Sequence, residues 1–182
     1  MRLPLLSQKH EPSTHETPLE FLHHVRILRG LTLEQLAIIL EMAREQHFRA
    51  GKAIITEGET GDTMFVLTEG VVEITIPLTL ETSRGEFSKR DKTLIRLKAE
   101  DHPCFGEMAL FGSDVRTATV TAVTDCTTLV LDKQSLLALE QEHLEIAYGI
   151  VRGIAEVLCA RVHQGNHDVL KLTTALSIAL SR

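Results

Sequence analysis

Phe-Gly-Glu-Met-Ala-Leu-Phe-Gly-Ser-Asp-Val-Arg-Thr-Ala-Thr-Val, at residues 105–120, is the most informative stretch of this 182-residue sequence. It opens with Gly106 and Glu107 at the start of a short helix-forming segment, and Arg116 follows nine residues after Glu107. The start of a helix offers unpaired backbone N–H groups and the positive end of the peptide dipole, which bind anionic oxygens. The guanidinium of Arg116 is permanently charged and suits bidentate contacts to phosphate. We therefore expect Arg116 and the backbone from Gly106 to Ala109 to bind one phosphate group.

Glu107 narrows the kind of ligand that this stretch can bind. A carboxylate repels a phosphate because both are negatively charged, but it is a good acceptor for hydroxyl groups. The stretch therefore predicts a site for a sugar phosphate, with Glu107 on the sugar and Arg116 on the phosphate.

Short β-rich runs bounded by turn residues lie on both sides of this stretch. Glycine-containing turns separate the earlier runs. This spacing is typical of a small antiparallel barrel or jelly roll. The mostly polar segment 78–92 is interpreted as a hairpin loop longer than the usual few residues. The expected strands are 48–50, 53–56, 64–68, 71–77, 93–97, 116–123 and 125–131.

Helical patterns flank the expected strands, so the predicted fold class is α+β. Thr32 and Gln35 have the spacing of a capping box, and Asp132 suits the N-cap of a later helix. Gly165 and Asn166 are expected to interrupt the last helical segment. The predicted organisation is a flexible tail at 1–17, N-terminal helices at 18–45, an antiparallel β jelly-roll barrel at 46–131 that contains 105–120, and C-terminal helices at 132–182 that act as a lid or in dimerisation.

The motif in this context resembles the cyclic nucleotide-binding domain family, the module shared by the catabolite activator protein, protein kinase regulatory subunits and cyclic nucleotide-gated channels. The resemblance rests on Gly-Glu followed at nine residues by Arg-Thr-Ala, within a series of short strands. It implies that Glu107 holds the ribose 2′-OH and that Arg116 holds the cyclic phosphate. It also implies that Ala109 and Thr117 add backbone or hydroxyl donors. The turn glycines that match the family are Gly51, Gly58, Gly61 and Gly70.

The resemblance further implies an apolar slot for the base and a lid over it. Leu97, Ala99 and Met108 are expected in the slot, and the helix around 152–161 is expected to supply the lid. A Thr at position 117 accompanies cGMP binding in many members, yet cAMP-binding members carry it too, so the expected ligand is cAMP or cGMP. The full set of expected ligand-binding residues is Leu97, Phe105, Gly106, Glu107, Met108, Ala109, Arg116, Thr117 and Ala118.

Composition excludes several other classes of function. The formal net charge is −6 and Lys and Arg are spread along the chain, which argues against nucleic acid as a partner. No stretch reaches the roughly 20 apolar residues that span a bilayer, and the N-terminus lacks the apolar core of a secretory signal, so we expect no membrane insertion. The three Cys lie far apart without metal-binding spacing, which favours the reduced cytoplasm.

The function predicted from these features is a regulatory domain that binds cAMP or cGMP, catalyses nothing and relays binding through its C-terminal helices. Those helices are expected to pair in a homodimer or to dock on an effector protein. A helix-turn-helix is not expected, because about 40 residues follow Glu142 and they contain no basic recognition helix.

Two alternatives stay open at this point. One is a scaffold of the same fold that binds no nucleotide and acts only as an interaction module. The other is a cupin-type metalloenzyme, which needs several His close together on the barrel strands. We expect no metal site, because His102 stands alone beside the 105–120 stretch and His47 lies at the first expected strand. We also expect no catalysis, because no nucleophile with a nearby His and an acid partner can be assembled.

Overall fold

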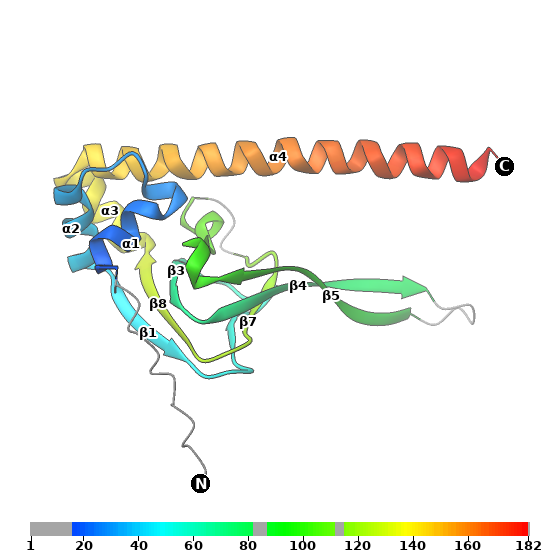
Figure 1. The fold of residues 1–182 in the computed structure, drawn as a ribbon, viewed down its shortest axis with the longest axis horizontal. Helices are drawn as coiled ribbons and strands as arrows, with labels where there is room; N and C mark the ends of the chain where they lie inside the picture. Colours follow the sequence, from blue (N-terminus) through cyan, green and yellow to red (C-terminus); the bar gives the residue numbers. More distant parts are fainter. Residues whose placement is uncertain (1–15, 82–86, 112–114, 182) are drawn as a thin grey trace, which may run out of the picture.

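Two antiparallel four-stranded sheets form the centre of the protein in a computed structural model, which describes residues 16–81, 87–111 and 115–181 (Figure 1). The strand orders are β1-β8-β3-β6 in one sheet and β2-β7-β4-β5 in the other. The predicted α+β fold is confirmed, and the two facing sheets have the double-sheet form of a jelly roll. The strands are β1 (Arg44–Phe48), β2 (Ala53–Ile55), β3 (Thr63–Glu69), β4 (Val71–Glu81), β5 (Phe87–Lys98), β6 (Cys104–Phe105), β7 (Thr119–Ala122) and β8 (Cys126–Asp132).

Buried apolar side chains from the two sheets form one core cluster. Phe65 on β3 and Phe105 on β6 stack with ring centroids 5.4 Å apart, and Leu67 and Val72 are completely buried beside them. The cluster anchors β6 directly before the 105–120 stretch. Packing of the two sheets therefore fixes where that stretch begins.

The segment 78–92 is largely strand, so its interpretation as a loop was wrong. β4 and β5 pair through eleven residue positions, out to Glu81 opposite Phe87. Residues 82–86, which join the two strands, lie outside the described residues. Ile76, Leu78 and Leu80 recur at every second position, which is the period of a strand, and this pattern continues β4 into the segment. Backbone pairing along both strands satisfies the amide groups. The resulting hairpin extends away from the rest of the sheet (Figure 1).

Capping side chains determine where the N-terminal helices begin. Thr17 and Glu20 form a capping box at the start of α1 (Pro18–His24), so Thr17 belongs to the helix start and not to the predicted tail. Residues 1–15 of that tail lie outside the described residues. The predicted Thr32–Gln35 box is present at the start of α2 (Leu33–Met42). A 3₁₀ turn, η1 (Arg26–Leu28), lies between the two helices.

The C-terminal helices differ from expectation in one respect. α3 (Lys133–Glu142) begins at the predicted N-cap Asp132, whose carboxylate accepts from the Ser135 backbone N–H at 2.8 Å. α4 (Leu144–Leu180) then runs for 37 residues without interruption, so the predicted break at 165–166 was wrong. A glycine inside a helix costs only about 1 kcal/mol relative to alanine, which a helix of this length tolerates.

The first half of α4 packs on the N-terminal helices, whereas its second half is exposed. A Cβ at Gly153 would lie within 2.0 Å of the Ile27 carbonyl oxygen, so only glycine lets α4 approach η1 this closely. Beyond Leu158 every described residue of α4 except Ala160 is exposed, and the helix extends past the sheets in the same direction as the β4–β5 hairpin (Figure 1). Within the described ranges, no helix combines the length and apolar character needed to cross a bilayer.

Candidate functional site

The nine residues predicted to bind ligand all line one cavity of about 570 Å³. The cavity lies between the 105–120 stretch, the sheet that contains β5 and the middle of α4. Its size suits a small organic ligand. Residues outside the expected ligand-binding set also line it, including Arg26, Leu94, Ile95, Asp101, His102, Val157 and Arg161.

Gly106 sets the backbone path into the cavity. Its φ of +81° lies in the left-handed region, and a Cβ there would lie 2.9 Å from the Thr63 carbonyl oxygen. The predicted short helix follows as a 3₁₀ turn, η3 (Glu107–Leu110). Within this turn the Ala109 N–H, which was expected to donate to the phosphate, donates to the Gly106 carbonyl at 3.2 Å. It therefore closes the turn.

Arg116 is almost fully buried, with 8% of its surface exposed. Its Nη1 donates to the Thr63 carbonyl at 2.8 Å and to the Gly106 carbonyl at 3.3 Å, and its Nη2 donates to Thr63 Oγ1 at 2.7 Å. These bonds use three of its five N–H groups. Burial lowers the pKa of Arg116 while the nearby Asp62 carboxylate opposes that shift, and an arginine stays charged under both influences. The structure therefore holds a positive charge in the cavity wall.

Glu107 is the most deeply buried charged residue in the described part of the chain, at 2% exposure. Its Oε1 accepts from Nη1 of Arg161 at 2.5 Å. Arg161 lies on α4, 54 positions further along the chain, and its own side chain is 53% exposed. α4 is thus bonded directly to the 105–120 stretch.

Arg161 is the functional candidate that the sequence did not identify individually. The expected lid segment 152–161 contained it, but no local pattern distinguishes it from Arg152, which pairs with Glu156 one helical turn away. Only the packing of α4 over the cavity brings Arg161 to Glu107. Val157, one turn before Arg161, lines the cavity as well.

Apolar residues from β5, η3 and α4 contribute to the cavity wall, together with Ile55, Ile74, Phe105 and Val120 from other strands. Leu97 and Met108 are both in it, as predicted, with Met108 48% exposed. Ala99, the third residue expected in the slot, packs against the core cluster between the sheets instead. Leu94 and Ile95 are half exposed and extend the apolar wall along β5.

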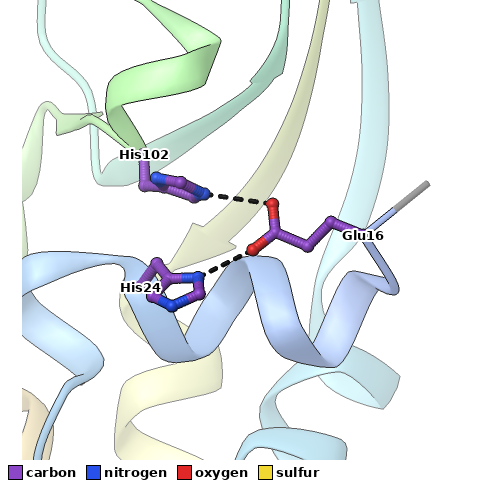
Figure 2. A group of neighbouring side chains, drawn as sticks. All are labelled: Glu16, His24 and His102. Atoms are coloured by element: carbon purple, nitrogen blue, oxygen red, sulfur yellow. Dashed lines mark hydrogen bonds and ion pairs between the residues drawn. The ribbon is translucent and has the colours of Figure 1, made fainter. Parts of the chain in front are cut away.

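His102 does not stand alone, so that expectation was wrong. Its ring lies beside His24 of α1, with centroids 5.1 Å apart, and both imidazoles contact the carboxylate of Glu16 (Figure 2). Glu16 and His24 lie eight positions apart, but His102 lies 86 positions from Glu16, so only the docking of α1 against the loop before β6 reveals the cluster.

Comparisons with known proteins agree with this geometry. Residues 45–143, more than half of the chain, match the model of the cyclic nucleotide-binding domain. The cGMP-dependent protein kinase egl-4 of Caenorhabditis elegans is 29% identical over 157 residues, which cover 85% of this chain but 19% of the kinase. The chain therefore spans less than a fifth of the length of that relative.

Solved structures share the fold. The catabolite activator protein of Thermus thermophilus superposes with a TM-score of 0.67 at 24% identity, covering 81% of this chain and 63% of that one. PfPKA-R with bound cAMP superposes with a TM-score of 0.52 at 29% identity, covering 66% of this chain and 39% of that one. By the match of residues 45–143 and by its jelly-roll sheets, this chain belongs to the cyclic nucleotide-binding domain family.

Proposed function

We propose that this chain senses a cyclic mononucleotide, cAMP or cGMP, catalyses no reaction, and relays binding through α4. The observation that carries the proposal is the placement of Arg116 and Glu107, both buried in the wall of one cavity, with Arg161 of α4 bonded to Glu107.

The charges around the cavity favour a ligand with one negative charge. Three arginines line it (Arg26, Arg116 and Arg161) against two carboxylates (Asp101 and Glu107), which leaves an excess of one positive charge. A cyclic nucleotide carries one negative charge on its phosphate. The excess positive charge of the wall therefore compensates the negative charge of the phosphate when it is buried beside Arg116. Burial of a charge without such compensation costs free energy.

The three chemical parts of the ligand match three parts of the wall. Arg116 has two N–H groups beyond those that hold it to Thr63 and Gly106, and they can donate to the phosphate oxygens. Glu107 uses Oε1 for Arg161, so its Oε2 can accept from a ribose hydroxyl. The base would lie against Leu97 and Met108.

The Glu107–Arg161 pair gives binding a route to α4. Arg161 lines the same cavity as Arg116, so a nucleotide phosphate in the cavity attracts Arg161 and with it α4. Binding thereby favours the docked position of α4, by no more than the difference in ligand affinity between the docked and undocked positions.

The exposed second half of α4 supports a homodimer as the output of this domain. Apolar residues recur along it every seven positions at Val162, Val169 and Leu176, and Leu172 lies between them at the spacing of the second coiled-coil position. All four are at least 60% exposed. A helix with this repeat buries its apolar stripe by pairing with an identical helix, so we assign the stripe to a parallel coiled coil with a second copy.

Isothermal titration calorimetry with cAMP and cGMP tests the binding proposal. The wild type should bind at least one of them, 5′-AMP should bind far more weakly, and Arg116→Ala should abolish binding. Arg116 is buried, so its replacement by Ala also tests the fold. Arg116→Lys, which keeps the charge, and a circular dichroism spectrum of each variant separate a loss of binding from a loss of folding. If neither nucleotide binds at high micromolar protein, the chain is a scaffold of the same fold and the proposal fails.

The cupin-type alternative receives no support from the arrangement of potential ligands. Within residues 16–81, 87–111 and 115–181, the one group of three potential metal ligands is Glu16, His24 and His102, which lies outside the core between the two sheets. A cupin centre would need such a group on strands facing that core.

A further inference from the structure

Three side chains of the types that bind metals in proteins meet at the surface where α1 docks against the loop that leads into β6. Glu16 precedes the N-cap of α1, His24 is the last residue of that helix, and His102 follows the short 3₁₀ turn η2 (Ala99–Asp101) (Figure 2). Nδ1 of His24 lies 2.7 Å from Glu16 Oε1, and Nε2 of His102 lies 3.1 Å from Glu16 Oε2. Each carboxylate oxygen is therefore directed at a different imidazole.

Local structure constrains the backbone beside Glu16 and the position of His102. The Thr17–Glu20 capping box fixes the backbone next to Glu16. His102 adopts the left-handed conformation with φ of +51°, and its N–H donates to the Ala99 carbonyl at 2.9 Å. Its ring packs on Phe21 of α1 with centroids 4.5 Å apart. The contact with Phe21 therefore holds the His102 ring beside α1.

The geometry of the three ligand atoms suits a small divalent ion. One nitrogen from each imidazole and one oxygen from the carboxylate all lie within 4.8 Å of one another. A zinc ion with bonds of about 2.0–2.2 Å separates its ligand atoms by about 3.4 Å in a tetrahedral site. The ligand atoms therefore need to move little to surround an ion placed between them.

The ligand types select the class of metal. Two imidazoles and a carboxylate favour zinc and similar divalent transition metals over Mg²⁺ and Ca²⁺, which prefer oxygen ligands only. The side chain of His102 is 21% exposed, that of Glu16 34% and that of His24 57%, so solvent can reach the cluster and supply a fourth ligand. We propose that Glu16, His24 and His102 form a binding site for a divalent transition-metal ion such as Zn²⁺.

A bound ion would tie α1 to the rim of the ligand cavity. His102 lines that cavity and lies two residues before Cys104, where β6 begins. The ion would thus join the N-terminal helices to the segment that leads into residues 105–120. Metal binding itself does not depend on the proposed nucleotide function, since all three ligands lie on the described chain without any contribution from a nucleotide.

Titration of the full chain with Zn²⁺ in the absence of nucleotide tests the site, by calorimetry and by competition with a chromophoric chelator. The wild type should bind one equivalent at this site, and His24→Ala and His102→Ala should each weaken it by about tenfold or more, because a three-ligand site loses a ligand. His23→Ala is the matched control, since His23 neighbours His24 on α1 but lies outside the cluster. It should bind as the wild type does.

Two further measurements keep the test decisive. His102→Ala removes a ring that packs on Phe21, so the more exposed His24→Gln provides a variant that should fold normally. His163 and His167 lie four residues apart on the exposed half of α4, and the double variant His163→Ala/His167→Ala measures any zinc they bind. Equal zinc binding by the wild type and His24→Gln would overturn the proposal and leave a hydrogen-bonded cluster only.

Discussion

Arg161 of α4 and Glu107 of η3 are joined at 2.5 Å across the mouth of the cavity, although 54 positions separate them in sequence. The carboxylate is almost fully buried and the guanidinium is half exposed. The pair therefore connects a residue proposed to bind the sugar with the helix proposed to carry the signal. It is the one direct bond between α4 and residues 105–111 and 115–120 in the described structure.

Arg161→Ala should lower the free energy of unfolding by about 1–3 kcal/mol, because a buried carboxylate loses its charged donor. Chemical denaturation at neutral pH measures this. Arg152→Ala is the control, since it removes only an exposed pair with Glu156 on the same helix and should cost no more than about 0.5 kcal/mol. Equal losses in the two variants would show that the Glu107 contact contributes nothing.

Gly61→Ala should impair nucleotide binding while leaving the fold intact. The added Cβ would lie 2.6 Å from Nε of Arg116 and must push the guanidinium aside. We expect a loss of affinity of about ten- to a hundredfold, equivalent to one charge-assisted hydrogen bond. Calorimetry with cAMP and cGMP measures it. Gly30→Ala, where a Cβ meets no atom within 4 Å, should bind normally, and the idea fails if both variants behave alike.

Thr117→Ala should reduce affinity for cGMP more than affinity for cAMP. Thr117 lines the cavity next to Arg116, and its hydroxyl can accept from the exocyclic amine of guanine. Adenine has no amine at that position. Thr117→Ser keeps the hydroxyl and should preserve the ratio of the two affinities. If the ratio of the cGMP and cAMP affinities is unchanged in Thr117→Ala, the Thr117 hydroxyl does not contact the guanine amine and contributes at most a bond to the phosphate.

Leu172→Glu should convert a dimer into a monomer, because it places a charge in the apolar stripe of α4. Sedimentation equilibrium measures the association. Lys171→Glu makes a charge change of similar kind at a neighbouring position outside the stripe, and it should leave the dimer intact. If the wild type is monomeric at all concentrations, the dimer is contradicted, and the apolar stripe would instead be a contact surface for an effector protein.

Asp132→Ala should destabilise the protein by about 1–2 kcal/mol at neutral pH, through loss of the α3 N-cap. Hydrogen bonds from Ser135 lower the pKa of Asp132 in the folded protein, and Arg44 adds to this shift. The stabilisation is therefore present above the unfolded pKa of about 4 and is lost as pH falls through the lower folded value. Thermal unfolding at neutral and acidic pH should show the difference between wild type and variant shrinking in acid.

Glu140→Ala, exposed on the same helix, is the control for this pH series. It should cost little at either pH. A constant difference between Asp132→Ala and the wild type across the series would mean that the cap does not depend on the charge of the carboxylate.

Much of the fold followed from local patterns in the sequence. Glycine turns between short β-rich runs predicted an antiparallel barrel or jelly roll, and the structure has two antiparallel sheets. Capping residues such as Thr32 and Asp132 marked helix starts correctly. These signals are reliable because turn conformations and caps depend on a few adjacent residues. In segment 78–92 the polar residues predicted a loop, whereas the structure has the paired strands of a hairpin, because cross-strand backbone pairing does not depend on the polarity of the side chains.

By itself the sequence determined the family and part of the cavity wall, since Glu107 and Arg116 belong to one short motif whose spacing is local. Only the tertiary structure decided which residues from distant parts of the chain lie beside the motif and beside the loop that precedes it. The packing of α4 brings Arg161 onto Glu107, and the docking of α1 brings Glu16 and His24 to His102. These contacts join residues that are 54 to 86 positions apart or lie on separate segments, and no local periodicity records them, because they depend on how whole elements pack around the core.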